Sequence, residues 1–312
     1  MNITHAGAPR ESVLIAGDGH PGLARRIAGH VGVTLTPAVI SAFADGETRV
    51  RIDADLGGKD VYLIQPTSTP TNERLMTLAL LADAARGLDA ARITAVMPYF
   101  GYARQDVRKT PGEPRSAQFA ARLLHAAGVD RAVVVELHSP ALESAFGMTL
   151  THLAADEALV AAVRAWGLGK LTVVSPDAGG LKRAQRFAER LGAPLAVVAK
   201  VRPATDVASA QQVLGEVRGR ICLIVDDMAS TGGTLAEAAQ TLTRAGATEV
   251  HGLFVHAVMA TGAGERLRAS PLGRLLTTDS VPAPAMDGLE VVSLAPLLAA
   301  AISRLSAAEK IL

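Results

Sequence analysis

The chain has 312 residues, of which 49% are hydrophobic and only 3% are aromatic. Its 31 Lys and Arg residues balance 30 Asp and Glu residues, so no global field favours nucleic acid or an acidic membrane surface. Cys222 is the only cysteine, which excludes a disulfide scaffold or a cysteine-based metal cluster within one chain. Without a signal-peptide pattern or an apolar stretch of about 18 residues, we expect a soluble cytoplasmic protein.

Short runs rich in Val, Ile and Leu alternate along the chain with segments of helical period. Continuous apolar strands separated by helices are typical of parallel sheets covered on both faces, so we expect an α/β fold. The segment 47–53 alternates polar and apolar residues, which predicts a strand with one face in water. Further strands are predicted at 12–17, 61–67, 93–100, 131–138, 171–176, 194–200, 221–227 and 249–258. Helices are predicted at 22–31, 72–87, 116–128, 179–192, 233–246 and 296–312.

The two halves of the chain repeat one pattern. A strand runs into a polar loop at 65–73 in the first half and at 175–180 in the second, and a helix and another strand follow each loop. We therefore expect two similar α/β domains, at 1–150 and 151–295, each with a mostly parallel sheet flanked by helices. The C-terminal helix is expected to pack on the first domain.

The stretch IVDDMASTGGT, residues 224–234, joins a predicted buried strand to a predicted helix. Open α/β sheets bind ligands at the carboxyl ends of strands, and helix N-termini attract anions. Taken alone, the STGGT segment fits a capped helix start equally well. Asp226 and Asp227 weaken that simpler interpretation, because paired carboxylates beside a buried strand cost stability unless they bind a sugar hydroxyl, a cation or both. The residues suited to cradle a phosphate are Ser230, Thr231, Gly232, Gly233 and Thr234.

A loop punctuated by Gly and Pro follows the strand at 93–100 and carries Arg104, Arg108, Lys109 and Arg115. Charged loops are usually only solvated. Arginines in a loop that follows a sheet strand are nevertheless suited to close over a polyphosphate. The pattern leaves both interpretations open.

Four shorter motifs place polar groups at strand ends or turns. ELHSP puts His138 at the end of a strand, where it is either a structural residue or a metal ligand. SPDAGG, at 175–180, reads as a second anion loop or as a plain Asp-Gly turn. KVRP puts Lys200 and Arg202 on one face of a strand, and FADGE, at 43–47, contains an Asp-Gly turn that needs no ligand.

An apolar strand, two aspartates, two further residues and Ser-Thr-Gly-Gly-Thr resemble the PRPP-binding motif of type I phosphoribosyltransferases, which usually have one such domain. A doubled chain with FADGE, PYFGYARQD, ELHSP, VSPDAGG and VDDMASTGGT in this order resembles the ribose-phosphate pyrophosphokinase (PRPP synthetase) family, from about residue 12 to about residue 306. The resemblance implies two type I phosphoribosyltransferase-like domains. It also implies transfer of the diphosphoryl group of MgATP to O1 of ribose 5-phosphate, giving PRPP and AMP.

The same resemblance implies roles for individual residues and a homo-oligomer with its adenine site near a subunit interface. Charge on the transferring group is expected to be neutralised by Lys200, Arg202 and Arg104, and Mg²⁺ to be bound by His138 and Asp177. ATP is expected at Phe43, Asp45, Glu47, Arg104, Gln105 and His138. Ribose 5-phosphate is expected at Asp226, Asp227, Ser230, Thr231, Gly232, Gly233 and Thr234, although the family often has an aspartate where Ser230 stands.

Two other functions remain open. A phosphoribosyltransferase that consumes PRPP shares the 225–234 motif but has no use for the 98–106 motif and His138 in a second domain. A catalytically inactive subunit that assembles with an active synthetase should have lost ligand residues, and these are present here. The balanced charge and the scarcity of aromatic residues disfavour nucleic acid as a partner. The roles of Arg108 and Lys109, the nucleotide preference, the subunit number and the effects of phosphate and ADP are not set by the sequence.

Overall fold

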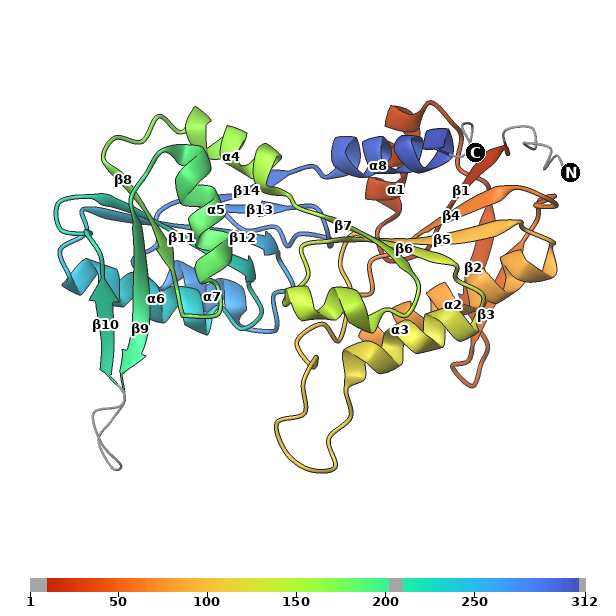
Figure 1. Ribbon diagram of the computed structural model, residues 1–312, viewed down its shortest axis with the longest axis horizontal. Helices are drawn as coiled ribbons and strands as arrows, with labels where there is room; N and C mark the ends of the chain where they lie inside the picture. Colours follow the sequence, from red (N-terminus) through yellow and green to blue (C-terminus); the bar gives the residue numbers. More distant parts are fainter. Residues whose placement is uncertain (1–9, 202–209, 309–312) are drawn as a thin grey trace, which may run out of the picture. The chain divides into compact units, whose positions relative to one another are not determined.

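The computed structural model describes residues 10–201 and 210–308, to which the structural statements below refer. The chain divides into two compact units, one comprising Met1–Ala154 and Ser293–Leu312 and the other Ala155–Val292. Each unit has a largely parallel sheet flanked by helices (Figure 1), which confirms the predicted fold class. Within the described ranges, no helix combines the length and the apolar character needed to cross a membrane.

The first unit contains a five-stranded parallel sheet in the order β1-β4-β5-β6-β7. The strands are β1 (Ser12–Ala16), β4 (Asp60–Ile64), β5 (Arg92–Met97), β6 (Arg131–Val135) and β7 (Thr149–Leu153), and a 3-10 helix, η1 (Pro140–Ala145), joins the last two. One face of the sheet carries α1 (Pro21–Val31) and α8 (Ala295–Ala308), and the other carries α2 (Thr71–Gly87) and α3 (Ser116–Ala126) (Figure 1). Because both faces are covered, β4 is buried at every position.

A two-stranded antiparallel ribbon of β2 (Ala38–Ala42) and β3 (Thr48–Ile52) packs on α2. Along β3, exposed Arg49 and Arg51 alternate with Val50 and Ile52, which face the core. This confirms the predicted strand with one wet face. The ribbon places the turn at 43–47 at its tip.

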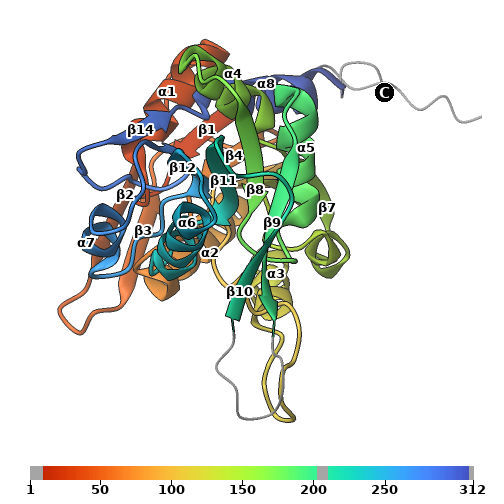
Figure 2. The same ribbon diagram turned by 90° about the vertical axis from the view of Figure 1, so that its left-hand side faces the viewer.

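The second unit contains a seven-stranded sheet in the order β10-β9-β8-β11-β12-β13-β14, in which only β9 and β10 pair antiparallel. The strands are β8 (Leu171–Ser175), β9 (Leu195–Val201), β10 (Ala210–Leu214), β11 (Ile221–Met228), β12 (Glu249–His256), β13 (Leu275–Thr278) and β14 (Leu289–Val292). The helices are α4 (Asp156–Ala165), α5 (Leu181–Leu191), α6 (Gly233–Arg244) and α7 (Ala263–Arg268). Figure 2 shows α5 and α6 on opposite faces of this sheet.

The neighbouring strands β8 and β11 feed connections that run in opposite directions across the second sheet. β8 continues through α5 to β9 on one side, whereas β11 continues through α6 to β12 on the other. Ligands of open α/β sheets bind at the carboxyl ends of the strands where the direction reverses in this way. The topology therefore points to the loops 176–180 and 229–232.

The only tryptophan of the chain, Trp166, ties the end of α4 to the sheet of the second unit. Its Nε1 donates to Glu290 Oε2 at 3.0 Å, and the guanidinium of Arg274 lies 4.7 Å from its ring centroid. His251 packs against Trp166 with ring centroids 5.6 Å apart, and its Nδ1 accepts the N–H of Arg274 at 3.0 Å. Burial lowers the pKa of His251, so the neutral ring acts as the acceptor.

We expect acid to weaken this contact. Because the folded pKa of His251 lies below its unfolded value of about 6.5, its contribution to the free energy of unfolding is fully present above that pH and is lost as the pH falls through the folded pKa. Urea unfolding followed by Trp166 fluorescence, at about pH 7.5 and about pH 5.5, measures the loss. His251→Gln keeps a neutral acceptor without the titration and should lose less stability than wild type between the two pH values. Equal losses would contradict this assignment.

Candidate functional site

Asp226 and Asp227 lie side by side where β11 reaches the carboxyl edge of the second sheet. Asp227 is only 4% exposed, and its N–H donates to Asp226 Oδ1 at 2.8 Å. Arg183 of α5, itself buried, places Nη1 3.9 Å from a carboxylate oxygen of each aspartate. One guanidinium at this distance compensates the two acids only in part.

The electrostatics of the pair favour a ligand. Burial, and next the charge of Asp227, raise the pKa of Asp226 to about 8. Two neighbouring carboxylates in a buried place cannot both ionise without a cost in stability. A bound cation, or sugar hydroxyls that donate hydrogen bonds, would lower that cost. The pair is therefore suited to hold a polyhydroxyl ligand, a divalent cation or both.

The loop after β11 is held by its carbonyl groups. Three successive carbonyl oxygens accept hydrogen bonds from the segment that follows β12 and from α7. The N–H of Met259 donates to the carbonyl oxygen of Ala229, and the N–H of Ala260 donates to that of Ser230, each at 2.9 Å. The guanidinium of Arg266 donates to the carbonyl oxygen of Thr231. In a planar trans peptide the N–H points opposite to the C=O, so the N–H groups of residues 230–232 point away from these partners. Together with the N-terminus of α6 they form an anion cradle.

The two glycines of the loop differ in the space that a Cβ atom would have at each position. Gly232 has a φ of 74°, and a Cβ there would lie 3.0 Å from Leu267 Cγ and 3.2 Å from the carbonyl oxygen of Ala263. A Cβ on Gly233 would meet only Thr231 Oγ1, at 3.5 Å. The packing of the second unit therefore requires glycine at position 232, whereas at position 233 it does not.

A buried polar layer supports the cradle, and the sequence analysis missed it. The N–H of Ala229 donates to the carbonyl oxygen of His256 at 3.0 Å, and His256 Nδ1 lies 2.8 Å from Ser280 Oγ. Thr278 Oγ1 donates to the carbonyl oxygen of Val255 at 2.7 Å. His256, Thr278 and Ser280 are at most 1% exposed. The available signal was the polar run TTDS, residues 277–280, directly after the two leucines that begin β13.

Asp177, in the loop after β8, stabilises the turn that leads into α5. Its Oδ1 accepts the N–H of Gly180 at 3.0 Å, and its carbonyl oxygen accepts from Ser175 Oγ at 2.7 Å. The bond to the Gly180 N–H supports the turn interpretation of SPDAGG, while the exposed carboxylate keeps a second oxygen. His138 is exposed and belongs to the first unit. Among the described residues, no three His, Cys, Asp or Glu side chains gather into a metal site, so a shared metal on His138 and Asp177 stays a prediction.

In the first unit a neutral side chain fills the corresponding edge of the sheet, where β1 and β4 are neighbours. Gln65 Oε1 accepts the N–H of Gly19 at 2.7 Å, and its Nε2 donates to Asp18 Oδ1 at 2.9 Å. Asp18 in turn pairs with Arg74. A Cβ on Gly17 would lie only 2.3 Å from Gln65 Oε1. The place between β1 and β4 thus holds a neutral amide, whereas the end of β11 carries an acid pair.

The basic loop of the first unit is irregular throughout residues 98–115. The predicted strand at 93–100 thus ends earlier, at Met97, and the loop begins three residues sooner than expected. Arg104 and Gln105 are exposed and line a hollow of about 280 Å³ together with Val107, Lys109, Glu113 and Pro114. A neighbouring hollow of about 390 Å³ is lined by Arg108, Pro114, Arg115, Gln118, Phe119 and Arg122. The loop thus presents cations to solvent in two places.

Residues 43–47 form the turn between β2 and β3. The N–H of Phe43 donates to the carbonyl oxygen of Glu47 at 2.8 Å, and the N–H of Glu47 donates to Asp45 Oδ1 at 3.2 Å. Asp45 therefore stabilises the turn, as the simpler interpretation of FADGE held. Phe43 is 50% exposed, and the guanidinium of Arg49 lies 5.7 Å from its ring centroid.

Two predicted site residues, Lys200 and Arg202, lie at the end of the first described range and just beyond it. Lys200 lies in β9, where its backbone is in register with Gln211 of β10. Arg202 lies outside the described residues. Their predicted role at the transferring group stays a prediction.

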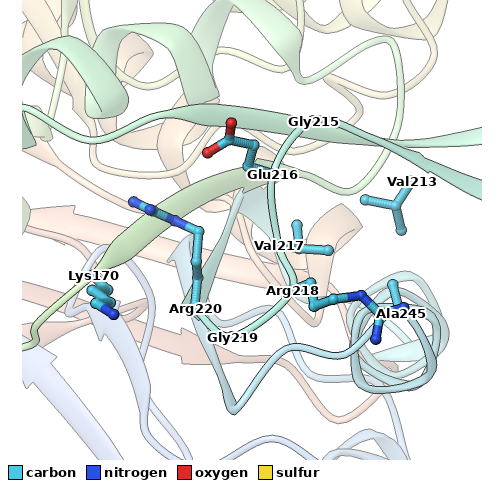
Figure 3. Close-up of a pocket in the computed structure, with 9 residues that line it drawn as sticks. All are labelled: Lys170, Val213, Gly215, Glu216, Val217, Arg218, Gly219, Arg220 and Ala245. Carbon is cyan, nitrogen blue, oxygen red and sulfur yellow. The ribbon is translucent and has the colours of Figure 1, made fainter.

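A hollow of about 520 Å³ lies at the opposite, amino edge of the second sheet (Figure 3). Its cationic side chains are Lys170, Arg218 and Arg220. The guanidinium of Arg220 donates to Thr172 Oγ1 at 2.6 Å and to the carbonyl oxygen of Leu171 at 2.8 Å. Because Arg220 supports the backbone here and the hollow is remote from the carboxyl ends of the strands, we assign it no part in the site.

We expect Gly232→Ala to destabilise the protein by about 1–3 kcal/mol, since the new Cβ meets Leu267 and Ala263 at a positive φ. Gly233→Ala is the matched control, and its stability should stay within about 0.5 kcal/mol of wild type. Urea unfolding of the three proteins without ligand makes the comparison. Equal stability of the two variants would show that the cradle does not depend on the left-handed residue.

Family models match the chain in two consecutive parts. The N-terminal domain of ribose phosphate pyrophosphokinase matches residues 12–128, and the phosphoribosyl transferase domain matches residues 150–268. A ribose-phosphate pyrophosphokinase from Gloeobacter violaceus is 42% identical over 297 residues, which cover 94% of this chain and 89% of the relative. One from Maricaulis maris is 42% identical over 304 residues, which cover 96% of this chain and 98% of the relative.

A comparison of folds agrees with the family models. The crystal structure of phosphoribosylpyrophosphate synthetase from Mycobacterium smegmatis superposes with a TM-score of 0.90 at 35% identity, covering 95% of this chain and 99% of that chain. The match therefore spans both units and the sequence motifs in them. The chain belongs to the ribose-phosphate pyrophosphokinase family.

Proposed function

We propose that this protein transfers the diphosphoryl group of ATP to O1 of ribose 5-phosphate and releases AMP. The observation that carries the proposal is the buried acid pair beside an anion cradle in the second unit, in a chain of this family. The O1 oxygen attacks the β-phosphorus of ATP and loses its proton. The bond from that phosphorus to the oxygen shared with the α-phosphorus breaks, and AMP leaves with that oxygen.

Ribose 5-phosphate binds at the second unit in this proposal. The N–H groups of residues 230–232 and the hydroxyls of Ser230, Thr231 and Thr234 hold the 5-phosphate, supported by the outward N–H orientation of the loop. Asp226 and Asp227 accept hydrogen bonds from the ribose hydroxyls, which would relieve the burial that raises the pKa of Asp226.

Mg²⁺ fits the oxygen-rich chemistry of the proposed site, since oxygen ligands are those it prefers. The raised pKa of Asp226 and the incomplete compensation by Arg183 support a cation beside the acid pair. His138 and Asp177 would hold a second one with ATP. When bound, the metal neutralises phosphate charge and helps to orient the substrates. The protein's own part is to place the ligand oxygens and to shield them from water.

ATP binds at the first unit in this proposal, which assigns the two units to the two substrates. Arg104 and Gln105 face a hollow that can take phosphate oxygens, and Lys200 and Arg202 neutralise charge on the transferring group. Phosphoryl-type transfers depend mainly on positioning and electrostatics, so the site needs no covalent nucleophile of its own.

The turn at 43–47 serves the adenine in this proposal, and a second copy of the chain supplies it. The half-exposed ring of Phe43, at the tip of a ribbon, offers a stacking surface that its own unit leaves open to solvent. The side chain of Asp45 and the carbonyl oxygen of Glu47 accept hydrogen bonds that stabilise the turn. We accordingly propose a homo-oligomer, and the nucleotide substrate is in keeping with a cytoplasmic location.

The direct test is AMP formation from MgATP with and without ribose 5-phosphate. We expect AMP only with ribose 5-phosphate, and a loss of at least about 100-fold in Asp226→Asn/Asp227→Asn, since two charged hydrogen-bond acceptors disappear. Asp83→Asn, an exposed change on α2, is the matched control and should behave as wild type. Purine-dependent release of pyrophosphate from PRPP without any AMP formation would instead identify a phosphoribosyltransferase.

Lys200→Ala should lower kcat far more than it raises KM for either substrate, because the lost charge acts on the transferring group. The same AMP assay, run over ranges of both substrates, separates the two constants. Lys59→Ala, just before β4, provides the control for removing a lysine. A change confined to KM would contradict the role assigned to Lys200.

A further inference from the structure

The root of the basic loop is fixed by Thr67, which follows β4 and is only 1% exposed. Thr67 Oγ1 accepts the N–H of Gly101 at 2.7 Å, and the N–H of Thr67 donates to the carbonyl oxygen of Tyr99 at 2.9 Å. A Cβ on Gly101 would lie 2.4 Å from the carbonyl oxygen of Thr67 and 2.8 Å from Thr71 Cγ2. The backbone at 99–101 is therefore held by a buried hydroxyl and leaves no room for a side chain at Gly101.

A second buried hydroxyl fixes the loop four residues later. Ser116, the first residue of α3 and 8% exposed, donates through Oγ to Gln105 Oε1 at 2.6 Å. The N–H of Ala117 donates to the carbonyl oxygen of Gln105 at 3.3 Å. Both the backbone and the side chain of Gln105 are thus tied to the start of α3.

Between these two points the chain makes a closed turn. The N–H of Gln105 donates to the carbonyl oxygen of Tyr102 at 2.8 Å, and the Tyr102 hydroxyl bonds to Asn72 Oδ1 on α2. Arg104 occupies this turn, with its own backbone fixed on both sides. Residues 101–105 are thus held by α2, α3 and the end of β4 at once.

The distal part of the loop closes on itself instead. Glu113 Oε2 accepts the N–H groups of Lys109 and Thr110, at 2.9 and 3.1 Å. These bonds lower the pKa of Glu113, so the carboxylate is charged at neutral pH. None of these bonds runs to Arg104 or Gln105, although Lys109 and Glu113 line the same hollow as those two residues. The loop thus has a part anchored to the rest of the unit, 101–105, and a tip, 109–113, in which the bonds of Glu113 are internal.

The bond from Ser116 also sets the direction of the Gln105 amide. An amide has one acceptor oxygen and one NH₂ group with two donors. With its oxygen held by Ser116, the amide turns its donors the other way, and Gln105 lines the hollow of about 280 Å³ beside Arg104. The hollow is therefore lined by the Arg104 guanidinium and the Gln105 amide, beside the Glu113 carboxylate. The N–H groups of Arg104 and Gln105 are the kind of donor that recognises phosphate and ring-nitrogen acceptors.

We infer that Thr67 and Ser116 are positioning residues that hold Arg104 and Gln105 ready before the nucleotide binds. The inference rests on the proposed function, in which these two side chains contact ATP. The physical advantage is preorganisation. Arg104 and Gln105 are ordered when the protein folds, so less of the binding free energy is lost in ordering them when ATP binds. Neither Thr67 nor Ser116 contacts a substrate in this inference, and both act through the loop segment that carries Arg104 and Gln105.

The experiment measures AMP formation over ranges of MgATP and ribose 5-phosphate. Ser116→Ala frees the amide and should raise KM for MgATP about fivefold, as expected for one hydrogen bond, and leave KM for ribose 5-phosphate unchanged. Ser116→Thr restores the hydroxyl and should rescue the effect. Gln105→Glu still accepts from Ser116 but cannot donate to the nucleotide. Adding Ser116→Ala to it should therefore change nothing more, since Ser116 acts through the amide donors.

Thr67→Val, with Thr67→Ser as its rescue, repeats the test at the other anchor and serves if Ser116→Ala does not fold. An unchanged KM for MgATP in the folded variants would overturn the inference. So would an equal effect of Ser116→Ala in wild type and in Gln105→Glu, or a parallel loss for both substrates. Wild type that forms no AMP would overturn the proposed function and the inference with it. If wild type forms AMP and Ser116→Ala has an unaltered KM for MgATP, the inference is overturned and the proposed function is not.

Discussion

Two neighbouring carboxylates, Asp226 and Asp227, are held at the point where a buried strand leaves the sheet, and one arginine 3.9 Å from each compensates them only in part. Such an arrangement works against folding. The fold tolerates it because β8 and β12 pair on both sides of β11, and because α5 brings Arg183 beneath the pair. The cradle next to it is oriented by bonds to its carbonyl groups. In the proposed function, the acid pair and the cradle together bind an anionic ligand with hydroxyl groups.

The two units use one architecture in different ways. At the switch of direction in the second sheet lies an acid pair that is only partly compensated, whereas at the carboxyl edge of the first sheet, between β1 and β4, the neutral amide of Gln65 bonds to its neighbours. The first unit instead presents Arg104 and Gln105 on a segment anchored to buried hydroxyls. A doubled fold can thus bind two different substrates, because side chains at equivalent edges differ in charge.

The sequence predicted those elements whose pattern is strong. Long apolar runs such as β4 and β11, and helices with clear glycine ends such as α1 and α5, lie where expected. The short or half-exposed strands β2, β7, β10, β13 and β14 and the helices α4 and α7 were not predicted, because packing rather than periodicity defines them. Arg183 was missed since it sits among Lys182, Arg186 and Arg190 on a basic helix, and only the tertiary fold separates its buried side chain from theirs. Likewise, the acid pair was visible in the sequence, but the bonds that orient the cradle come from residues about 30 positions away.

In the proposed function, the acid pair is kept at the expense of stability because a ligand uses it. The measurement is the free energy of unfolding of ligand-free protein in EDTA, for wild type and Asp226→Asn, across the pH range. Because folding raises the pKa of Asp226 to about 8 from an unfolded value of about 4, wild type should lose stability as the pH rises between these values. Asp226→Asn lacks this loss and should become the more stable protein toward about pH 8, while binding ribose 5-phosphate more weakly. Identical pH dependence in the two proteins, or a variant less stable at every pH, would contradict the account.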